Sequence, residues 1–359
     1  MNTLLLTCGT LESGGAERVI SILSSPFADH FGKVWIATWR EAPIFYSFDP
    51  RVTVISLPKV AQSDRIVKKG MAFRKMVKNL RPSIVLSFLS PFNMLTLVFL
   101  KDVHVIKVVA ERNDPRFIKG GVIMRAIRNM LYKQADGILC QTQFIKKCFP
   151  KRLQSKICII YNPVFLDQCL VGKALGAKKL NRIVAVGRLH PQKNHKMLID
   201  AFAKFSEKYP DYTLIIYGKG ELRDDILNYI GNIGMASRIF LPGEDKDVQW
   251  HITKAQMFVM TSFFEGMPNA LIEAMCLGLP CVSTKVSGAI DLIKSGENGI
   301  LVDTTVEAIS KAMEDIASDS IAMKRLGKNA AILYNELKVE NISAQWIACL
   351  DSFVKDLKE

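Results

Sequence analysis

The sequence has 359 residues, of which 49% are hydrophobic and 23% charged. This length suffices for about two domains, and the composition is that of an ordinary globular protein, which excludes low-complexity and heptad-repeat classes. The net charge of +14 lies in the first half, because residues 1–164 hold 25 of the 48 Lys and Arg but only 10 of the 34 Asp and Glu.

Short apolar segments alternate with helix-sized segments along the chain. In the first half we expect strands at 3–8, 34–39, 52–56, 84–88, 105–109, 137–140 and 157–161. In the second half we expect them at 182–187, 213–218, 238–243, 257–262, 280–284 and 298–302. Continuous apolar strands separated by helices indicate parallel sheets that are covered on both faces. The pattern restarts after residue 165, which predicts an α/β fold of two doubly wound, Rossmann-like domains facing a cleft, at 1–165 and 166–337, with a closing helical segment at 338–359.

The first strand leads into a glycine-rich loop, TCGTLESGGAERV, at residues 7–19. Gly14 and Gly15 precede a helix that we expect from about Ala16, and the start of a helix favours an anionic ligand. The loop matches neither G-x-G-x-x-G nor the P-loop pattern. A tight turn without a ligand is the alternative interpretation.

The excess of cations predicts an anionic partner for the first half, either a membrane surface or a nucleic acid. Residues 64–82 interleave seven cations with apolar side chains, which is typical of a helix at a membrane surface; a core-packed helix with a solvated basic face is the alternative. No nucleic-acid-binding module is recognisable, so we expect no nucleic acid. The charge-free segment 83–100 approaches the length of a membrane span, but its Ser, Pro and Asn residues favour a buried strand, a turn and a helix.

The eight cysteines are scattered and none forms a C-x-x-C pair. This spacing predicts reduced, cytosolic thiols and neither a disulfide framework nor a zinc site. The first ten residues have no basic segment and too short an apolar run for a signal peptide, so we expect a cytoplasmic protein.

The second domain opens with VGRLHPQKNHKMLIDAF at residues 186–202. Arg188 and Lys193 lie at a strand end and a helix start, where doubly wound sheets bind anionic ligands. Two ordinary surface cations are the alternative. Further along, Asp245 and Asp247 have the spacing of a metal-binding D-x-D pair, but they begin a helical segment, where the helix dipole favours acids. We therefore expect no metal and no other cofactor.

The stretch FFEGMPNALIEAM, residues 263–275, combines two acids with an expected apolar helix. A helix from Pro268 would be apolar around its circumference except at Glu273, and a buried carboxylate without a partner is very costly. Carboxylates at Glu265 and Glu273 suit hydroxyl groups on either side of a diphosphate. The N–H groups that suit the phosphates belong to Asn269, Ala270 and Leu271. This pattern describes a nucleoside diphosphate sugar; local protein partners for both acids are the alternative.

The segments GGAERV, VGRLHPQKN, FFEGMPNALIEAMCLGLPCVST and SGENGILV together resemble the retaining glycosyltransferases of family four, which have the GT-B fold. The resemblance runs across nearly the whole chain and rests on the E-x7-E element and the R-x4-K pair. It implies that Gly15 approaches the donor's diphosphate and that Arg188 and Lys193 bind it. It also implies that Glu273 binds the ribose and Glu265 the transferred sugar. Arg188, Lys193 and Glu265 are the expected catalytic residues.

The resemblance implies a reaction and not a particular sugar. A hexose or N-acetylhexosamine would pass with retention from a nucleotide diphosphate sugar, expected to be a UDP-sugar, to a glycan acceptor. Many such enzymes extend sugars on a polyprenyl diphosphate at the inner face of the membrane, so we expect this acceptor, peripheral attachment there, and a role in lipopolysaccharide or capsule synthesis. A sugar-nucleotide epimerase of the same fold and a non-catalytic protein that binds anionic lipid are the alternatives. A nicotinamide-dependent oxidoreductase would need the missing G-x-G-x-x-G motif.

One position departs from the family's pattern. Many relatives have a histidine after a strand of the first domain, where this chain has VVAERNDPRF at residues 108–117. Glu111 or Asn113 is expected to take its place, or the role is absent. His190 and His195 lie near the expected phosphate loop and do not match this position.

Overall fold

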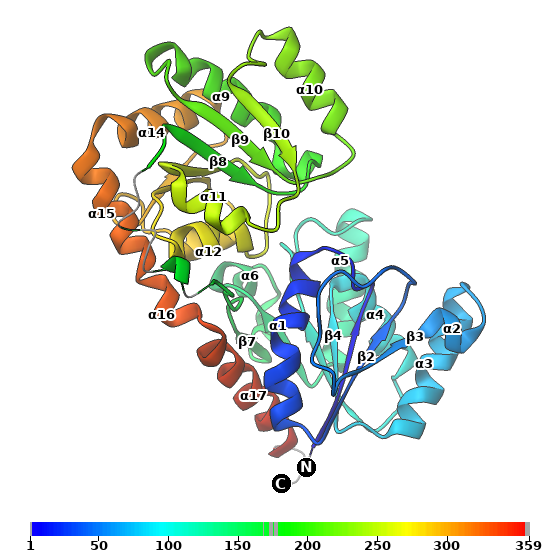
Figure 1. The fold of residues 1–359 in the computed structure, drawn as a ribbon. Coiled ribbons are helices and arrows are strands. Elements are labelled where there is room, and N and C mark those ends of the chain that lie inside the picture. Colours follow the sequence, from blue (N-terminus) through cyan, green and yellow to red (C-terminus); the bar gives the residue numbers. More distant parts are fainter. Residues whose placement is uncertain (1, 168, 172–174, 176–178, 356–359) are drawn as a thin grey trace. The chain divides into compact units, whose positions relative to one another are not determined.

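The computed structural model describes residues 2–167, 169–171, 175 and 179–355 (Figure 1). Its internal contacts divide the chain into two compact units. Unit 1 comprises the chain up to Pro163 and again from Leu337, and unit 2 comprises Val164–Glu336. Unit 2 is therefore inserted in the sequence between two parts of unit 1.

Unit 1 is built on a seven-stranded sheet in the order β3-β2-β1-β4-β5-β6-β7, and all neighbouring strands are parallel. Its strands are β1 (Thr3–Cys8), β2 (Lys33–Thr38), β3 (Thr53–Ser56), β4 (Ile84–Phe88), β5 (Ile106–Ala110), β6 (Gly137–Cys140) and β7 (Ile157–Ile159). The order turns back at the β1–β4 pair, which makes the sheet doubly wound.

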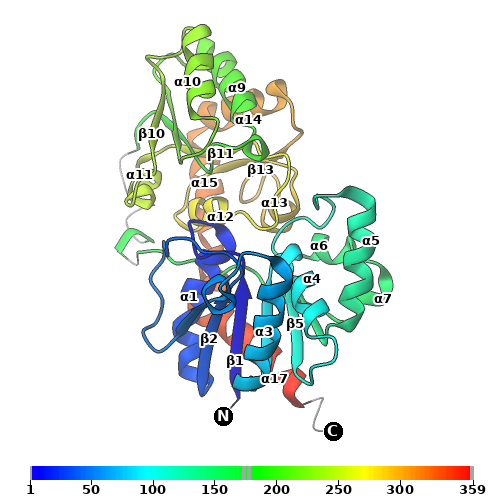
Figure 2. The same cartoon turned by 90° about the vertical axis from the view of Figure 1, so that its right-hand side faces the viewer.

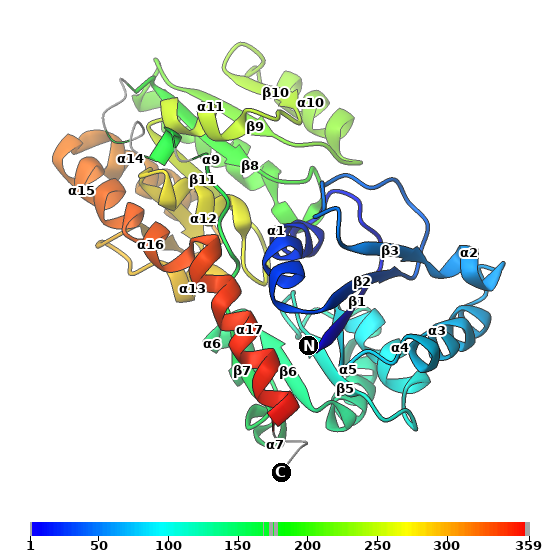
Figure 3. The ribbon, with the colours of Figure 1, turned by 60° about the horizontal axis from the view of Figure 1, so that its bottom comes forward.

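The helices of unit 1 cover both faces of this sheet. Figure 2 shows α3 (Ile66–Leu80), α4 (Ser90–Phe99) and α5 (Gly121–Leu131) next to one another along one face, and α4 packs against both of its neighbours. Figure 3 shows α1 (Gly15–His30) and α17 (Val339–Lys355) on the opposite face, where they pack against each other. The shorter helices are α2 (Leu57–Ala61), η1 (Tyr132–Gln134), α6 (Gln143–Lys147) and α7 (Lys151–Gln154).

Helix α17 completes the core of unit 1, although it lies at the other end of the sequence from β1. Its Trp346 is fully buried, stacks on Phe88 at a centroid distance of 5.9 Å, and meets Phe27 of α1 edge-on at 6.3 Å. Further along α17, the ring of Phe353 occupies the space that a Cβ atom at Gly137 of β6 would need. The closing helix is therefore an integral layer of unit 1.

Unit 2 is built on a six-stranded parallel sheet in the order β10-β9-β8-β11-β12-β13. Its strands are β8 (Arg182–Val186), β9 (Thr213–Tyr217), β10 (Ile239–Gly243), β11 (Met257–Met260), β12 (Cys281–Thr284) and β13 (Ile300–Val302). Helix α9 packs against α10 and α14, and α12 packs against α11 and α15. The helices are η2 (Pro191–Lys193), α9 (His195–Lys208), α10 (Arg223–Asn232), α11 (Val248–Lys254), α12 (Asn269–Cys276), α13 (Ser287–Leu292), α14 (Val306–Ser318), α15 (Ser320–Ala331) and α16 (Leu333–Leu337).

The predicted fold class of two doubly wound parallel sheets is confirmed. Every strand expected from the sequence is present, and its ends differ from the expected ones by one or two residues at most. The charge-free segment 83–100 forms β4 and α4, as expected. Among the described residues, no helix combines the length and the hydropathy that crossing a membrane would require.

Candidate active site

The loop after β8 carries the two cations expected to bind phosphate. The chain leaves β8 at Val186 and reaches η2 and then α9 within nine residues, and the Arg188 side chain on this loop is exposed. Gly218 at the end of β9 has a φ of 139°, and a Cβ atom there would overlap the carbonyl of Gly187. The two loops thus meet at the carboxyl ends of β8 and β9, where ligands bind in sheets of this kind.

His195, the first residue of α9, is hydrogen-bonded to the loop after β8. Its ring is buried, with 6% exposure, and Nε2 lies 3.1 Å from the carbonyl oxygen of Arg188. Burial lowers the pKa of His195 to about 4, the hydrogen bond to Arg188 opposes this shift, and the charge of Lys193 adds to it. The imidazole is therefore neutral near pH 7 and donates its Nε2 proton to the Arg188 carbonyl.

Lys193 and Glu265 are paired directly. The Nζ atom of Lys193 donates to Oε1 of Glu265 at 2.5 Å, and the Ser262 hydroxyl donates to the same oxygen at 2.7 Å. The Lys193 and Glu265 side chains are only 17% and 10% exposed. The motifs suggested separate partners for these residues, one on the diphosphate and one on the sugar, whereas the structure brings them together.

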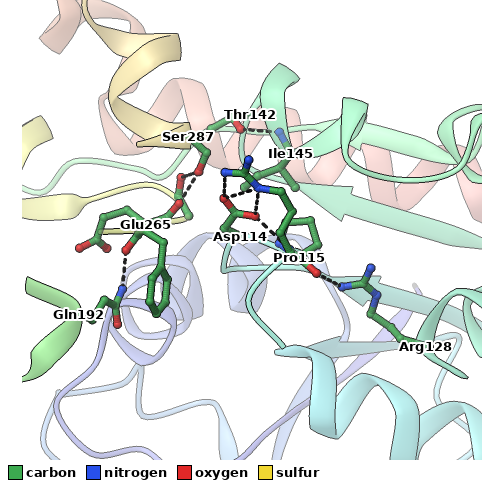
Figure 4. Close-up of polar contacts among 11 residues, drawn as sticks. Asp114, Pro115, Arg128, Thr142, Ile145, Gln192, Glu265 and Ser287 are labelled. Carbon is green, nitrogen blue, oxygen red and sulfur yellow. Dashed lines mark hydrogen bonds and ion pairs between the residues drawn. The ribbon is translucent and has the colours of Figure 1, made fainter. Parts of the chain in front are cut away.

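A set of polar contacts holds the loop that carries Glu265. Gln192 donates through Nε2 to the carbonyl of Phe264 at 2.8 Å, and the Ser287 hydroxyl donates to the Glu265 carbonyl (Figure 4). The Thr284 hydroxyl donates to the Ser262 carbonyl at 2.7 Å. Sequence reasoning missed these residues. Ser262 was detectable, because it follows β11 three residues before Glu265, but Ser287 lies beyond another strand.

Helix α12 begins one residue later than expected, with Pro268 before its first residue Asn269. The first backbone bond of the helix runs from the Ile272 N–H to the Pro268 carbonyl at 3.1 Å. The N–H groups of Asn269, Ala270 and Leu271 therefore stand outside the helical ladder, at the positive end of the dipole.

Glu273 lies in the interior, as its apolar surroundings in the sequence indicated. It is 4% exposed, and its neighbours Leu271, Ile272 and Ala274 are buried as well. Burial raises the pKa of the Cys276 thiol, and the nearby charge of Glu273 adds to this shift. The prediction of a buried helix that contains one acid is confirmed; the ligand of that acid stays a prediction.

In unit 1, α1 begins at Gly15, one residue earlier than expected, and Gly14 precedes it in extended conformation. Gly15 is exposed. A Cβ atom at Gly14 would overlap the carboxylate of Glu17, which therefore lies over the start of the helix. The predicted role of this turn in binding an anion stays a prediction.

Glu111 is a buried group of the unit 1 core. It is 1% exposed and accepts hydrogen bonds from Ser90 at 2.6 Å and from Tyr132 at 3.0 Å. Burial raises the pKa of Glu111, and Arg128, whose Nη1 lies 4.0 Å away, opposes that shift. In this conformation the Glu111 carboxylate is engaged by residues of the unit 1 core, and its contact with a sugar stays a prediction. Asn113 is exposed, and its role in place of the missing histidine stays a prediction as well.

The loop that presents Asn113 is anchored on both sides by charged residues. Arg112 is buried, donates to Asn162, and lies 5.7 Å from the ring centroid of Trp346; burial lowers its pKa to about 9. Asp114 is 2% exposed and accepts from Nη2 of Arg116 at 2.7 Å (Figure 4). Asn113 thus lies between two residues whose side chains are held by contacts within unit 1.

The D-x-D pair lies immediately before helix α11, at the start of a helical segment as expected. Oδ1 of Asp245 accepts from the backbone N–H of Asp247 at 2.8 Å, immediately before α11, and Oδ2 lies 3.0 Å from Nε2 of His251. Across the part of the chain that the structure describes, no three His, Cys, Asp or Glu side chains are grouped so that they could hold a metal ion.

The family model "Glycosyl transferases group 1" matches residues 172–332, the region that contains Arg188, Lys193, Glu265 and Glu273. This part of the chain is similar to the group 1 glycosyl transferases. The resemblance inferred from the motifs is thus confirmed for the half of the chain that holds the expected donor site.

One relative extends this result over nearly the whole chain, and a second matches a little less than half of it. A Campylobacter jejuni protein, 26% identical over 94% of this chain and 95% of its own length, is named GalNAc-alpha-(1->4)-GalNAc-alpha-(1->3)-diNAcBac-PP-undecaprenol alpha-1,4-N-acetyl-D-galactosaminyltransferase. An Escherichia coli protein, 31% identical over 46% of each chain, is named UDP-Gal:alpha-D-GlcNAc-diphosphoundecaprenol alpha-1,3-galactosyltransferase.

The crystal structure of Anabaena HepE in complex with UDP superposes with a TM-score of 0.80 at 18% identity, over 98% of this chain and all of that one. The chain thus has the GT-B fold, as the motifs implied. It is a glycosyltransferase of the kind found in bacterial polysaccharide synthesis.

Proposed function

We propose that the protein transfers a hexose or N-acetylhexosamine, with retention of anomeric configuration, from a UDP-sugar to a glycan carried on a polyprenyl diphosphate. The observation that carries the proposal is the Lys193–Glu265 pair, since it brings the cation expected to bind the diphosphate into direct contact with the carboxylate expected to bind the sugar. The names of the two relatives support it, because both contain a diphosphate-linked undecaprenol and one contains UDP-Gal.

The donor's diphosphate would bind to Arg188, to Lys193 and to the N–H groups at the start of α12. An ammonium group has three donors, so the one that Lys193 gives to Glu265 leaves two for phosphate oxygens. Glu273 would accept from the ribose hydroxyls and Glu265 from a hydroxyl of the transferred sugar. Charge-assisted hydrogen bonds of this kind are worth about 1.5–3 kcal/mol each.

Charge development explains why these groups promote transfer. As the bond between the anomeric carbon and the diphosphate breaks, the sugar becomes electron-poor and the leaving oxygen becomes negative. Preorganised cations and the dipole of α12 stabilise that oxygen, which removes the need for a metal ion. The acceptor hydroxyl then bonds to the anomeric carbon on the face that the diphosphate leaves, and its proton passes to the leaving phosphate oxygen.

We also propose that unit 1 attaches the protein to the anionic inner face of the cytoplasmic membrane. Its excess of cations supports this, and so does a lipid-linked acceptor. One cation of the expected basic helix does not take part: Lys69 of α3 is buried and donates from Nζ to the Trp39 carbonyl at 3.0 Å. Exposed Lys68, Lys75 and Lys78 remain on that helix.

The test is a panel of nucleotide sugars offered with a synthetic polyprenyl-diphosphate glycan. Sugar transfer from a UDP-α-sugar, with an α-linkage in the product by proton NMR, is the expected result. A β-linked product would contradict retention. Conversion of the donor to its epimer without any acceptor would establish the epimerase alternative instead.

A further inference from the structure

Helix α5 is amphipathic, but its apolar side faces outward. The only residue of this helix that is buried is an arginine, Arg128, with 1% exposure. Ile123 is 75% exposed, Val122 69% and Met130 56%. We define the α5 stripe as the exposed apolar residues of this helix and of the loop before it: Phe117, Val122, Ile123, Ile127 and Met130.

Arg128 fixes the rotation of α5. Its Nη1 donates to the Pro115 carbonyl at 2.9 Å (Figure 4). Its guanidinium lies 4.7 Å from the ring centroid of Phe149. The same Nη1 is 4.0 Å from the buried carboxylate of Glu111. Turning the stripe inward would remove this cation from a buried acid, which is strongly unfavourable. The outward position of the stripe is therefore built into the core of unit 1.

The surroundings of the stripe are cationic. Between residues 115 and 135 the sequence contains Arg and Lys but no Asp or Glu. Arg116 is paired with Asp114, and Arg128 is buried, so the cations available to a partner are Lys119, Arg125 and Lys133. An apolar stripe with cations along its edges matches an anionic lipid bilayer, which has an apolar interior and a negatively charged surface.

We propose that α5 lies in the interface of an anionic bilayer, with the α5 stripe among the acyl chains and Lys119, Arg125 and Lys133 at the headgroups. The inference rests on the membrane attachment proposed above and names the element that carries it. The sequence pointed to α3 for this role. Phe73, Met76 and Val77 of that helix are buried in unit 1, and its exposed apolar residues are confined to its first two turns, at Ile66, Val67 and Met71.

Co-sedimentation of the full chain with vesicles tests the proposal. Vesicles of phosphatidylcholine with phosphatidylglycerol are compared with phosphatidylcholine alone, at low and high salt. The variant Ile123→Ser/Met130→Ser is expected to lower the partition coefficient at least tenfold on anionic vesicles. The matched control, Ile321→Ser/Ile332→Ser, removes two equally exposed isoleucines of unit 2, at 80% and 59%, and is expected to bind like the wild type.

Further measurements separate this inference from the function it rests on. Both variants should transfer sugar to a water-soluble, short-chain acceptor at the wild-type rate, and loss of that activity in the α5 variant would overturn the assignment to lipid. If Ile66→Ser/Met71→Ser on α3 releases the protein while the α5 variant stays bound, the attachment stands and this inference fails. If the wild type binds no vesicle, the proposed membrane attachment and its assignment to α5 both fail. A dimer that only the α5 variant disrupts would assign the stripe to a second copy of the chain.

Discussion

Lys193 donates to Glu265 across 2.5 Å, although the two residues are 72 positions apart and reach the site from different strands. The acid therefore orients the cation before any donor arrives. This pairing also means that the carboxylate offsets part of the positive charge that the diphosphate would meet. Binding of the diphosphate and reactivity of the sugar should respond differently when the pair is altered.

Glu265→Gln is expected to lower the transfer rate by roughly 10- to 100-fold, because it removes a charge-assisted hydrogen bond to the sugar. The same change should leave UDP affinity unchanged or raise it severalfold, since Lys193 loses its neutralising partner. Initial rates and calorimetry with UDP measure the two effects. Ser262→Ala, which removes one hydrogen bond to the same oxygen and no charge, is the control and should have the smaller effect on rate. Equal losses of UDP affinity in Glu265→Gln and Lys193→Ala would refute this division of roles.

Arg188→Ala is expected to reduce transfer by about 10²- to 10³-fold, which is the usual effect of removing one preorganised stabiliser of a leaving group. Because the Arg188 side chain is exposed, the free energy of unfolding should change by no more than about 0.5 kcal/mol. Lys204→Ala, another exposed cation of unit 2, serves as the control and should retain full activity. An Arg188→Ala enzyme with normal rates would remove this residue from the mechanism.

Glu273→Gln should weaken binding of UDP by roughly tenfold or more, because the amide accepts from the ribose less strongly than the carboxylate. The decisive comparison uses UDP and its 2′,3′-dideoxy analogue on both proteins, as a double-mutant cycle. The wild type should prefer UDP strongly, and the variant should show little preference. A variant that loses the same affinity for both nucleotides would indicate a structural role for Glu273 and no contact with the ribose.

His195 makes the stability of unit 2 depend on pH. Its pKa of about 4 in the folded state lies below the value of about 6.5 in an unfolded chain, so the unfolded chain binds more protons between these values. The contribution of the neutral His195 ring to the free energy of unfolding is fully present above about pH 6.5 and is lost as the pH falls towards 4. It amounts to about 2 kcal/mol between pH 7 and pH 5.

His195→Gln keeps an amide donor for the Arg188 carbonyl but cannot titrate. Its free energy of unfolding should therefore fall less between pH 7 and pH 5 than that of the wild type. Urea unfolding of the full chain at both pH values measures the difference. If the free energy of unfolding changes equally with pH in the wild type and the variant, the His195 ring is already charged in the folded protein, or gains its proton there without loss of stability.

Much of the candidate site in unit 2 could be predicted from local pattern. An acid in an otherwise apolar helix is unusual enough to single out Glu273, and burial of that helix follows from its composition. The contact of Lys193 with Glu265 could not be predicted, because it depends on how the ends of β8 and β11 meet.

Two features of the structure could not be read from the sequence, for one physical reason. Glu111 was singled out because it stands where many relatives have a histidine, but the sequence could not show its hydrogen-bond partners Ser90 and Tyr132, which come from other elements. The segments of α3 and α5 are both amphipathic, and a sequence pattern cannot tell which side of a helix faces the core. For α5 the decision comes from the buried Arg128.

The position of Trp346 has a consequence for the order of biosynthesis. A ribosome completes every strand of unit 1 and the whole of unit 2 before it makes α17, so the hydrophobic slot beside Phe27 and Phe88 stays open during translation of more than half of the chain. A nascent chain in that state exposes an incomplete apolar surface, on which chaperones and proteases act. Unit 2, whose sequence is uninterrupted, can mature first, and unit 1 completes its core only once α17 has been made.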